Sequence, residues 1–166
     1  AWVSTGYVVA NVIVLPISGW LSAQLGRRNY MALSILIFIV SSMACGQATT
    51  LEGLVFWRIV QGLGGGGLLS TAQTTLMEVF PPQEIGKAMA IFGLGIMVGP
   101  MLGPTVGGYL TEQYSWPWIF YINLPLGLIA LLLSLIYVPD SWHQVRAKKV
   151  DYIGLLLLAI GIGALQ

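Results

Sequence analysis

Six long stretches of this 166-residue sequence contain no aspartate, glutamate, lysine or arginine. About 20 predominantly apolar residues in a helix cross the hydrocarbon core of a bilayer, and most of these stretches reach that length. Because backbone groups inside lipid must find their hydrogen bonds within the segment, such stretches favour helices. The sequence therefore predicts a series of membrane-spanning helices. The stretches are residues 1–26, 29–51, 59–77, 88–111, 113–139 and 152–166.

The composition excludes an ordinary soluble domain and speaks against several kinds of site. Only 8% of the residues are charged and 57% are apolar, with a mean hydropathy of +0.84, whereas about a quarter of the residues in a soluble domain are charged. The net charge of +1 and the lack of a basic tract indicate no nucleic-acid partner. Cys45 is the single cysteine and His143 the single histidine. We therefore expect no disulfide framework, no metal site, no cofactor and no histidine-dependent catalysis.

The charge-free stretches predict an all-α, polytopic membrane helix bundle. Its five complete spans, within residues 1–138, are expected at residues 3–21, 30–45, 54–77, 88–109 and 118–138. Residues 139–150 contain a basic cluster and are expected to form a cytoplasmic loop. Residues 151–166 are expected to start a further helix that stops too early to cross the bilayer. Both ends look cut, so we interpret the chain as a fragment of a larger membrane protein.

The basic residues outside the spans all lie in alternate loops. Arg27 and Arg28 follow the first span, Lys87 precedes the fourth, and a third group follows the fifth. The intervening loops, near residues 46–53 and 110–117, contain no lysine or arginine. Since cytoplasmic loops are enriched in these residues, we expect the basic loops on the cytoplasmic side of a plasma membrane. The third group is Arg146, Lys148 and Lys149.

Arg58 is the one charged residue that falls inside a predicted span. An arginine near the centre of a membrane helix costs about 2.5–3.5 kcal/mol and usually faces the interior of a bundle or a water-filled cavity. The alternative is that its side chain snorkels to the interface near Leu51, about 10 Å away along the helix. Small and polar residues are expected on the same helical face, which favours a cavity. They are Gly62, Gly66, Ser70 and Gln73, with Gln61 and Gly65 alongside.

The fourth span carries glycines spaced four residues apart, with prolines between them. Small residues at this spacing let two membrane helices approach closely, and each proline removes a backbone hydrogen bond and bends the helix. Simple close packing would explain the glycines alone. Because it would leave the bends unexplained, we favour a shaped helix at a moving interface. The residues are Gly95, Gly99, Pro100, Gly103, Pro104, Gly107 and Gly108.

Two asparagines inside the spans are weaker candidates. Asn11 lies in the first span and Asn123 in the fifth. Membrane asparagines most often only form a hydrogen bond to a neighbouring helix. The candidate substrate path therefore combines these two residues with the polar residues around Arg58, namely Gln61, Ser70 and Gln73.

Several motifs resemble those of the major facilitator superfamily. The segment Leu54-x-x-x-Arg58-x-x-Gln61-Gly62-x-Gly64 is similar to the arginine motif of that family's fourth helix. Residues 99–108, which read Gly-Pro-x-x-Gly-Pro-x-x-Gly-Gly, resemble the antiporter motif of its fifth helix. Residues 116–127 resemble the sixth-helix signature of the fourteen-helix drug:proton antiporters of the EmrB/QacA type, and residues 2–7 and 16–21 resemble that group's second helix. The resemblance runs from end to end of the chain.

The resemblance implies a function and a place for each segment. The five spans would be helices two to six of a transporter, and the segment at Tyr152 would start helix seven. The implied activity is proton-driven export of drug-like, amphipathic small molecules by alternating access across the bacterial inner membrane, with a periplasmic adaptor protein as a further partner. Arg58 would take part in proton coupling. No carboxylate lies within a complete span, so the proton-carrying acid is expected outside this chain.

The loop after the first span resembles the family's loop between helices two and three, with one departure. That loop usually contains an acidic residue, and this sequence has Ala23 in its place. A gate contact that depends on an acid at that position is therefore not expected here. The residues assigned to the cytoplasmic gate loop are Gly19, Gly26, Arg27 and Arg28.

Two other functions stay open at this stage. A symporter or facilitator of the same superfamily would share the architecture and import its solute, although the glycine and proline pattern argues against it. A membrane-embedded enzyme or an assembly subunit would require a catalytic constellation. The chain offers only His143 and a few loop carboxylates for that purpose.

Overall fold

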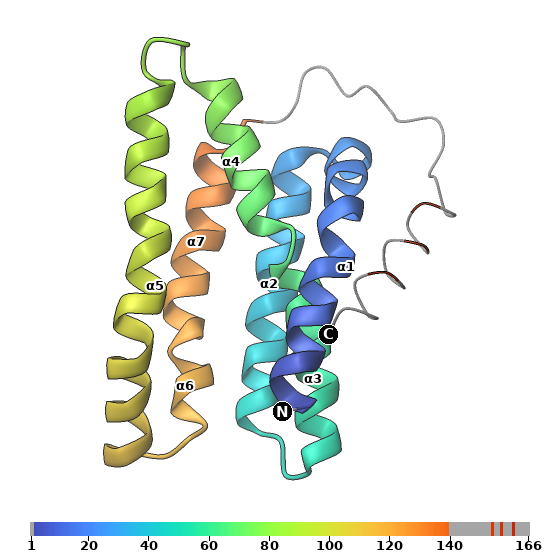
Figure 1. Cartoon of the computed structure of the whole chain (residues 1–166), viewed down its shortest axis with the longest axis vertical. Coiled ribbons are helices and arrows are strands. Elements are labelled where there is room, and N and C mark those ends of the chain that lie inside the picture. The colour runs from blue at the N-terminus through green and yellow to red at the C-terminus, as the bar shows by residue number, and fades with distance from the viewer. Residues whose placement is uncertain (1, 140–153, 155–156, 158–160, 162–166) are drawn as a thin grey trace.

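The computed structural model describes residues 2–139, 154, 157 and 161, and Figure 1 shows a bundle of helices. No strand occurs among the residues so described, and the predicted all-α fold class is confirmed. The expected cytoplasmic loop and the start of the next helix lie almost entirely outside the described residues. In chain order the helices are α1 (Trp2–Leu25), α2 (Arg27–Gly46), α3 (Leu51–Gly65), α4 (Leu68–Val79), α5 (Ile85–Gln113), α6 (Trp118–Tyr121) and α7 (Asn123–Tyr137).

Four helical segments of the described chain are long and apolar enough to cross a membrane. They are α1, α2, α5 and the combined segment Trp118–Tyr137, which contains α6 and α7. These segments coincide with the first, second, fourth and fifth predicted spans. The helix α5 extends past the predicted limits of 88 and 109 at both ends. The reason is that apolar length marks the part of a helix inside lipid, while the backbone hydrogen bonds continue beyond it.

The third predicted span is wrong as a single helix, because the structure divides it into α3 and α4. The break falls at Gly66 and Gly67 within a run of four glycines. Glycine is the weakest helix former apart from proline. The backbone here also lies against its neighbours, since a Cβ atom added at Gly66 would be 2.6 Å from the Asn11 carbonyl oxygen. Both segments still run in sequence from one end of the bundle to the other (Figure 1).

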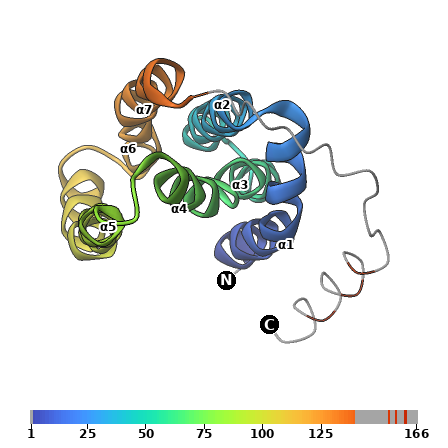
Figure 2. The same ribbon diagram turned by 90° about the horizontal axis from the view of Figure 1, so that it is seen from above.

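The helix α3 lies at the centre of the packing. It packs against α1 and α2, and α2 also packs against α7. Figure 2 shows α4 between α5 and the group formed by α1, α2 and α3. Within the described part of the chain, α5 contacts only α4 and α6, and none of its residues is buried. The glycine and proline face of α5 is therefore open in this part of the protein.

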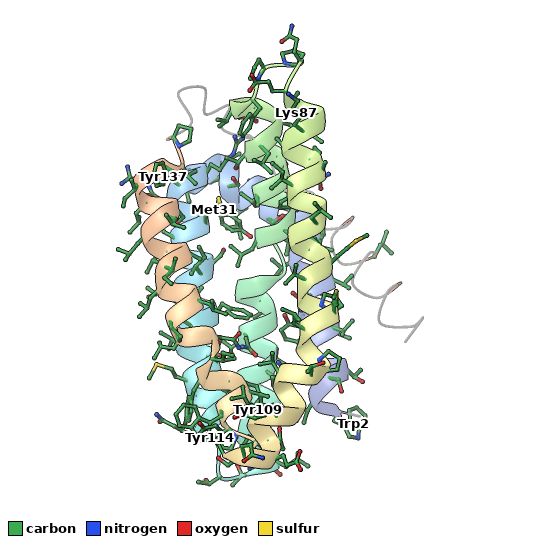
Figure 3. All side chains as sticks on the ribbon, turned by 90° about the vertical axis from the view of Figure 1, so that its left-hand side faces the viewer. Trp2, Met31, Lys87, Tyr109, Tyr114 and Tyr137 are labelled. Atoms are coloured by element: carbon green, nitrogen blue, oxygen red, sulfur yellow. The ribbon has the colours of Figure 1, made fainter. Side chains whose placement is uncertain are left out.

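The ends of the bundle agree with the predicted alternation of loops. Lys87 lies in the first turn of α5, directly after the turn from α4. Figure 3 shows it at the opposite end of the bundle from Tyr109 and Tyr114. The basic pair Arg27 and Arg28 begins α2, directly after the turn from α1. This end of α2 lies at the Lys87 end of the bundle, because Arg27 forms an ion pair with Glu78 of α4. The predicted cytoplasmic loops among the described residues thus share one end.

Candidate functional site

Arg58 lies within α3, and its side chain forms a hydrogen bond with a residue of the same helix. Its Nη1 atom donates a hydrogen bond of 3.0 Å to Oε1 of Gln61. Residues three apart face the same side of a helix, so the two side chains meet without distortion. Gln61 is only 1% exposed and is the largest of the fully buried side chains. The amide is thus a fixed part of the interior.

Two aromatic rings from other helices flank the guanidinium group of Arg58. Its Cζ atom lies 4.7 Å from the ring centroid of Tyr7 on α1 and 5.3 Å from that of Phe120 on α6. A cation over an aromatic face gains about 0.5–2 kcal/mol, with the larger values where water is excluded. Three elements of the fold therefore converge on one positive charge.

The charge of Arg58 has no acidic partner in the part of the chain that the structure describes. No carboxylate among the described residues forms an ion pair with it, and its Nε atom is buried without a hydrogen-bond partner. A cation that is partly removed from water costs free energy unless it is compensated. The side chain lies against the rings of Tyr7 on α1 and Phe120 on α6. The cavity that the sequence favoured over snorkelling stays a prediction.

A short hydrogen-bonded chain fixes one of the two rings. The Asn123 side chain donates to Oγ of Ser42 at 3.1 Å, and that hydroxyl donates to the carbonyl oxygen of Phe120 at 2.9 Å. These bonds tie the junction of α6 and α7 to α2. Phe120 is 7% exposed. Asn123 thus contributes to the placement of the ring over Arg58, which its assignment to a substrate path did not anticipate.

The other predicted path residues do not gather around Arg58. Asn11 donates to the carbonyl oxygen of Tyr7 on its own helix at 2.9 Å. Ser70 and Gln73 lie exposed on α4, beyond the break in the span. Of the residues expected on one polar face, Gln61 is the one that a hydrogen bond joins to Arg58 among the described residues.

The glycines of α3 form a packing face against the neighbouring helices. A Cβ atom at Gly62 would lie 2.6 Å from the Tyr7 carbonyl oxygen, and one at Gly64 would lie 2.9 Å from the Phe38 backbone nitrogen. At Gly62 the expected small and polar stripe is therefore closed by α1, and Gly64, outside that stripe, packs against α2. The glycine run was the signal for this close approach, since only residues without Cβ allow it.

The glycines of α5 and those of the gate loop differ in their surroundings. A Cβ atom at Gly95, Gly99, Gly103 or Gly108 would meet nothing within 4 Å among the described residues. Gly26 has a φ of 83°, which favours glycine, and it allows the sharp turn from α1 into α2. Gly19 lies on α1, and a Cβ atom there would meet nothing within 4 Å.

Arg28, the other basic residue assigned to the gate loop, has a buried Nε atom without a hydrogen-bond partner.

Arg27 and Glu78 form an ion pair that joins the predicted gate loop to the end of α4. Arg27 donates to both carboxylate oxygens of Glu78, one of them at 2.7 Å, and Glu78 lies one residue beyond the predicted span. The hydrogen bond from Arg27 lowers the pKa of the Glu78 carboxyl from its ordinary value of 4.5. Sequence reasoning placed Arg27 in the loop but did not identify Glu78 as its partner.

We expect a small, pH-dependent loss of stability from E78Q. Because the pKa of Glu78 is lowered on folding, the pair stabilises the protein above pH 4.5, and this contribution disappears as the pH falls through the folded-state pKa. The Glu78 side chain is 55% exposed, so the effect should stay below about 1 kcal/mol. The thermal unfolding midpoints of full-length wild type and E78Q should differ at pH 7 and converge below pH 4.5 or in high salt. Equal midpoints at pH 7 would show that the pair adds nothing.

Comparison with known proteins decides the family. The model of the Major Facilitator Superfamily matches residues 1–165, which is nearly the whole chain. The chain belongs to the major facilitator superfamily. The resemblance drawn from the motifs is thereby confirmed, and this member of the superfamily is a membrane protein that crosses the bilayer several times.

Curated relatives of this superfamily member carry names of drug exporters. The chain is 37% identical over 165 residues to the multidrug export protein EmrB of Escherichia coli (strain K12), which covers 99% of the chain and 32% of EmrB. It is 37% identical over 166 residues to multidrug resistance protein 3 of Bacillus subtilis (strain 168), which covers 100% of the chain and 32% of that protein. The chain therefore spans about a third of the length of these relatives.

A solved structure supports the fold. A double Trp mutant of XylE superposes with a TM-score of 0.73 at 19% identity, over 98% of this chain and 41% of that one. At this identity the likeness concerns the arrangement of the helices alone. It agrees with the helix bundle that the charge pattern predicted.

Proposed function

We propose that this chain provides helices two to six of a proton-driven multidrug exporter of the bacterial inner membrane. The observation that carries the proposal is the position of Arg58, a cation without an acidic partner among the described residues, enclosed by groups from α1, α3 and α6. The names of the curated relatives, multidrug export and multidrug resistance proteins, support drug-like molecules as the substrate class.

The proposed role of Arg58 is electrostatic. A fixed positive charge near a carboxylate favours the ionised acid and lowers its pKa by roughly 1–3 units. The carboxylate would come from a part of the transporter outside this chain, because none of the complete spans contains one. When the two helix bundles of such a transporter rock about a site near the midplane, the distance between the two groups changes. The acid would then bind a proton on one side of the membrane and release it on the other.

The other predicted residues take supporting roles in this proposal. Asn11, Gln61, Ser70, Gln73 and Asn123 are the candidates for polar contacts along the substrate path. The face of α5 that carries Gly95 to Gly108 would pack against moving helices outside the described residues, because its glycines permit close approach. The loop with Gly26 and Arg27 would form part of the cytoplasmic gate, and a periplasmic adaptor protein would extend the export path.

Transport direction in inverted membrane vesicles tests this function. Vesicles that contain the full-length protein should accumulate an amphipathic fluorescent dye when their interior is acidified, because the cytoplasmic face then points outward. Dissipation of the proton gradient with a protonophore should release the dye. Accumulation that occurs only in right-side-out vesicles would indicate a symporter. Equilibration of the dye across the membrane, with or without the proton gradient, would indicate a facilitator. Either result would contradict the proposal.

A further inference from the structure

The residue that accepts the hydrogen bond from Arg58 is a neutral glutamine, Gln61, and not a glutamate. It is the largest fully buried side chain of the described residues, and its amide oxygen accepts the hydrogen bond of Arg58 at 3.0 Å. A glutamate has nearly the same shape and would offer the same oxygen together with a negative charge. For a cation that serves only to hold helices together, the carboxylate would be the stronger partner. The sequence places a neutral amide there.

The other groups around Arg58 are neutral as well. Tyr7 on α1 and Phe120 on α6 present aromatic faces. The titratable groups near Arg58 in the described residues are Tyr7 and the thiol of Cys45 on α2, which interacts with it electrostatically. Neither of them is a carboxylate, and no described residue forms an ion pair with the guanidinium. Neither α6 nor α3 itself adds a charged group at the guanidinium.

We propose that Gln61 is a positioning residue that fixes the Arg58 guanidinium by a neutral hydrogen bond and leaves its positive charge unneutralised for proton coupling. This inference rests on the proposed coupling role of Arg58. The physical reason is that a carboxylate 3 Å from the guanidinium would form a close pair whose field largely cancels at longer range. A proton-carrying acid that approaches from another helix would then be attracted weakly. An amide restrains the same nitrogen without this cancellation.

Phe120 completes this arrangement from a third element. Its ring covers the guanidinium, and the bonds through Ser42 and Asn123 hold its backbone against α2. Position and charge of Arg58 are thus controlled by separate groups. The amide of Gln61 and the two rings set the position, and the lack of an acidic partner among the described residues preserves the charge.

The pH profile of transport under Q61E tests the inference. In the full-length protein in inverted vesicles, Q61E should reduce dye transport at neutral pH by about tenfold and move the pH profile about one unit toward alkaline values, because a carboxylate that has lost its cation ionises at higher pH. Q61M keeps the volume without the hydrogen bond, and it should lower the rate without moving the profile. The matched control is Q47E, the same change at the exposed Gln47 in the loop after α2, which should leave rate and profile unchanged.

Two results would overturn the inference. One is that Q61E reaches the membrane in normal amounts and its pH profile of transport is the same as that of the wild type. The other is a wild-type rate for Q61M, which also decides the question if Q61E fails to insert. The variant R58A in the same assay separates this inference from the proposed function. If R58A retains proton-driven transport, the coupling role of Arg58 is wrong. If R58A loses transport while Q61E keeps the wild-type profile, only the role of Gln61 is wrong.

Discussion

R58A should lower proton-driven drug efflux by about a hundredfold while the protein remains in the membrane, because loss of a nearby cation raises the pKa of a carboxylate by roughly 1–3 units. An acid with a raised pKa keeps its proton on the cytoplasmic side, and the transport cycle stops at that step. The side chain also carries no structural ion pair among the described residues whose loss would unfold the bundle. The measurement is efflux of a fluorescent substrate from energised cells, normalised to the amount of protein in the membrane.

R58K serves as the matched variant for this prediction. Lysine keeps the charge but lacks the planar fork that donates to Gln61 and stacks on the rings of Tyr7 and Phe120. We therefore expect efflux between that of wild type and that of R58A. Undiminished proton-driven efflux in R58A would contradict the coupling role.

G62A should strongly reduce the amount of folded protein. Its new Cβ atom would lie 2.6 Å from the Tyr7 carbonyl oxygen and 2.8 Å from the Cβ atom of Ala10, so α1 and α3 would have to move apart. Overpacking of a close contact costs about 1–3 kcal/mol. Separation of α1 from α3 would also displace Tyr7 from Arg58. The thermal unfolding midpoint of the purified full-length protein and its abundance in the membrane measure the effect.

G86A is the control for this prediction. Gly86 lies in the first turn of α5, and a Cβ atom there would meet nothing within 4 Å. Alanine is a better helix former than glycine by up to about 1 kcal/mol, so G86A should be neutral or slightly stabilising. Replacing glycine by alanine is thus expected to lower the stability at position 62 and to leave it unchanged or raise it slightly at position 86. If G62A proved as stable as G86A, the close contact between α1 and α3 would be refuted.

The spacing of charges was sufficient to predict most of the helices. A charged residue in lipid is costly, so the limits of α1, α2 and the segment of α6 and α7 follow from where charges stop. The break between α3 and α4 could not be predicted in this way. Glycines 64–67 are compatible with a small-residue face on a continuous helix and with an interruption, and the close approach of Asn11 and Tyr30 to the break is a property of the packed bundle.

Of the candidate site, the sequence predicted Arg58 and Gln61 but not the aromatic rings around them. Arg58 is conspicuous because it is the one charge within a span, and Gln61 follows at the spacing of a helical neighbour. Tyr7 and Phe120 belong to segments 51 residues before and 62 residues after Arg58. No periodicity within one helix reveals which distant ring will cover a cation. The partnership of Ser42 with Asn123 is hidden for the same reason.

Substrate-induced proton release from the purified full-length protein tests the central claim most directly. Addition of a drug-like substrate in weakly buffered solution should release protons as the substrate displaces them from the coupling acid. The pH midpoint of this release should lie at least one unit higher in R58A than in wild type, because Arg58 favours the ionised form of that acid. Identical midpoints for wild type and R58A, with substrate still bound, would contradict the account.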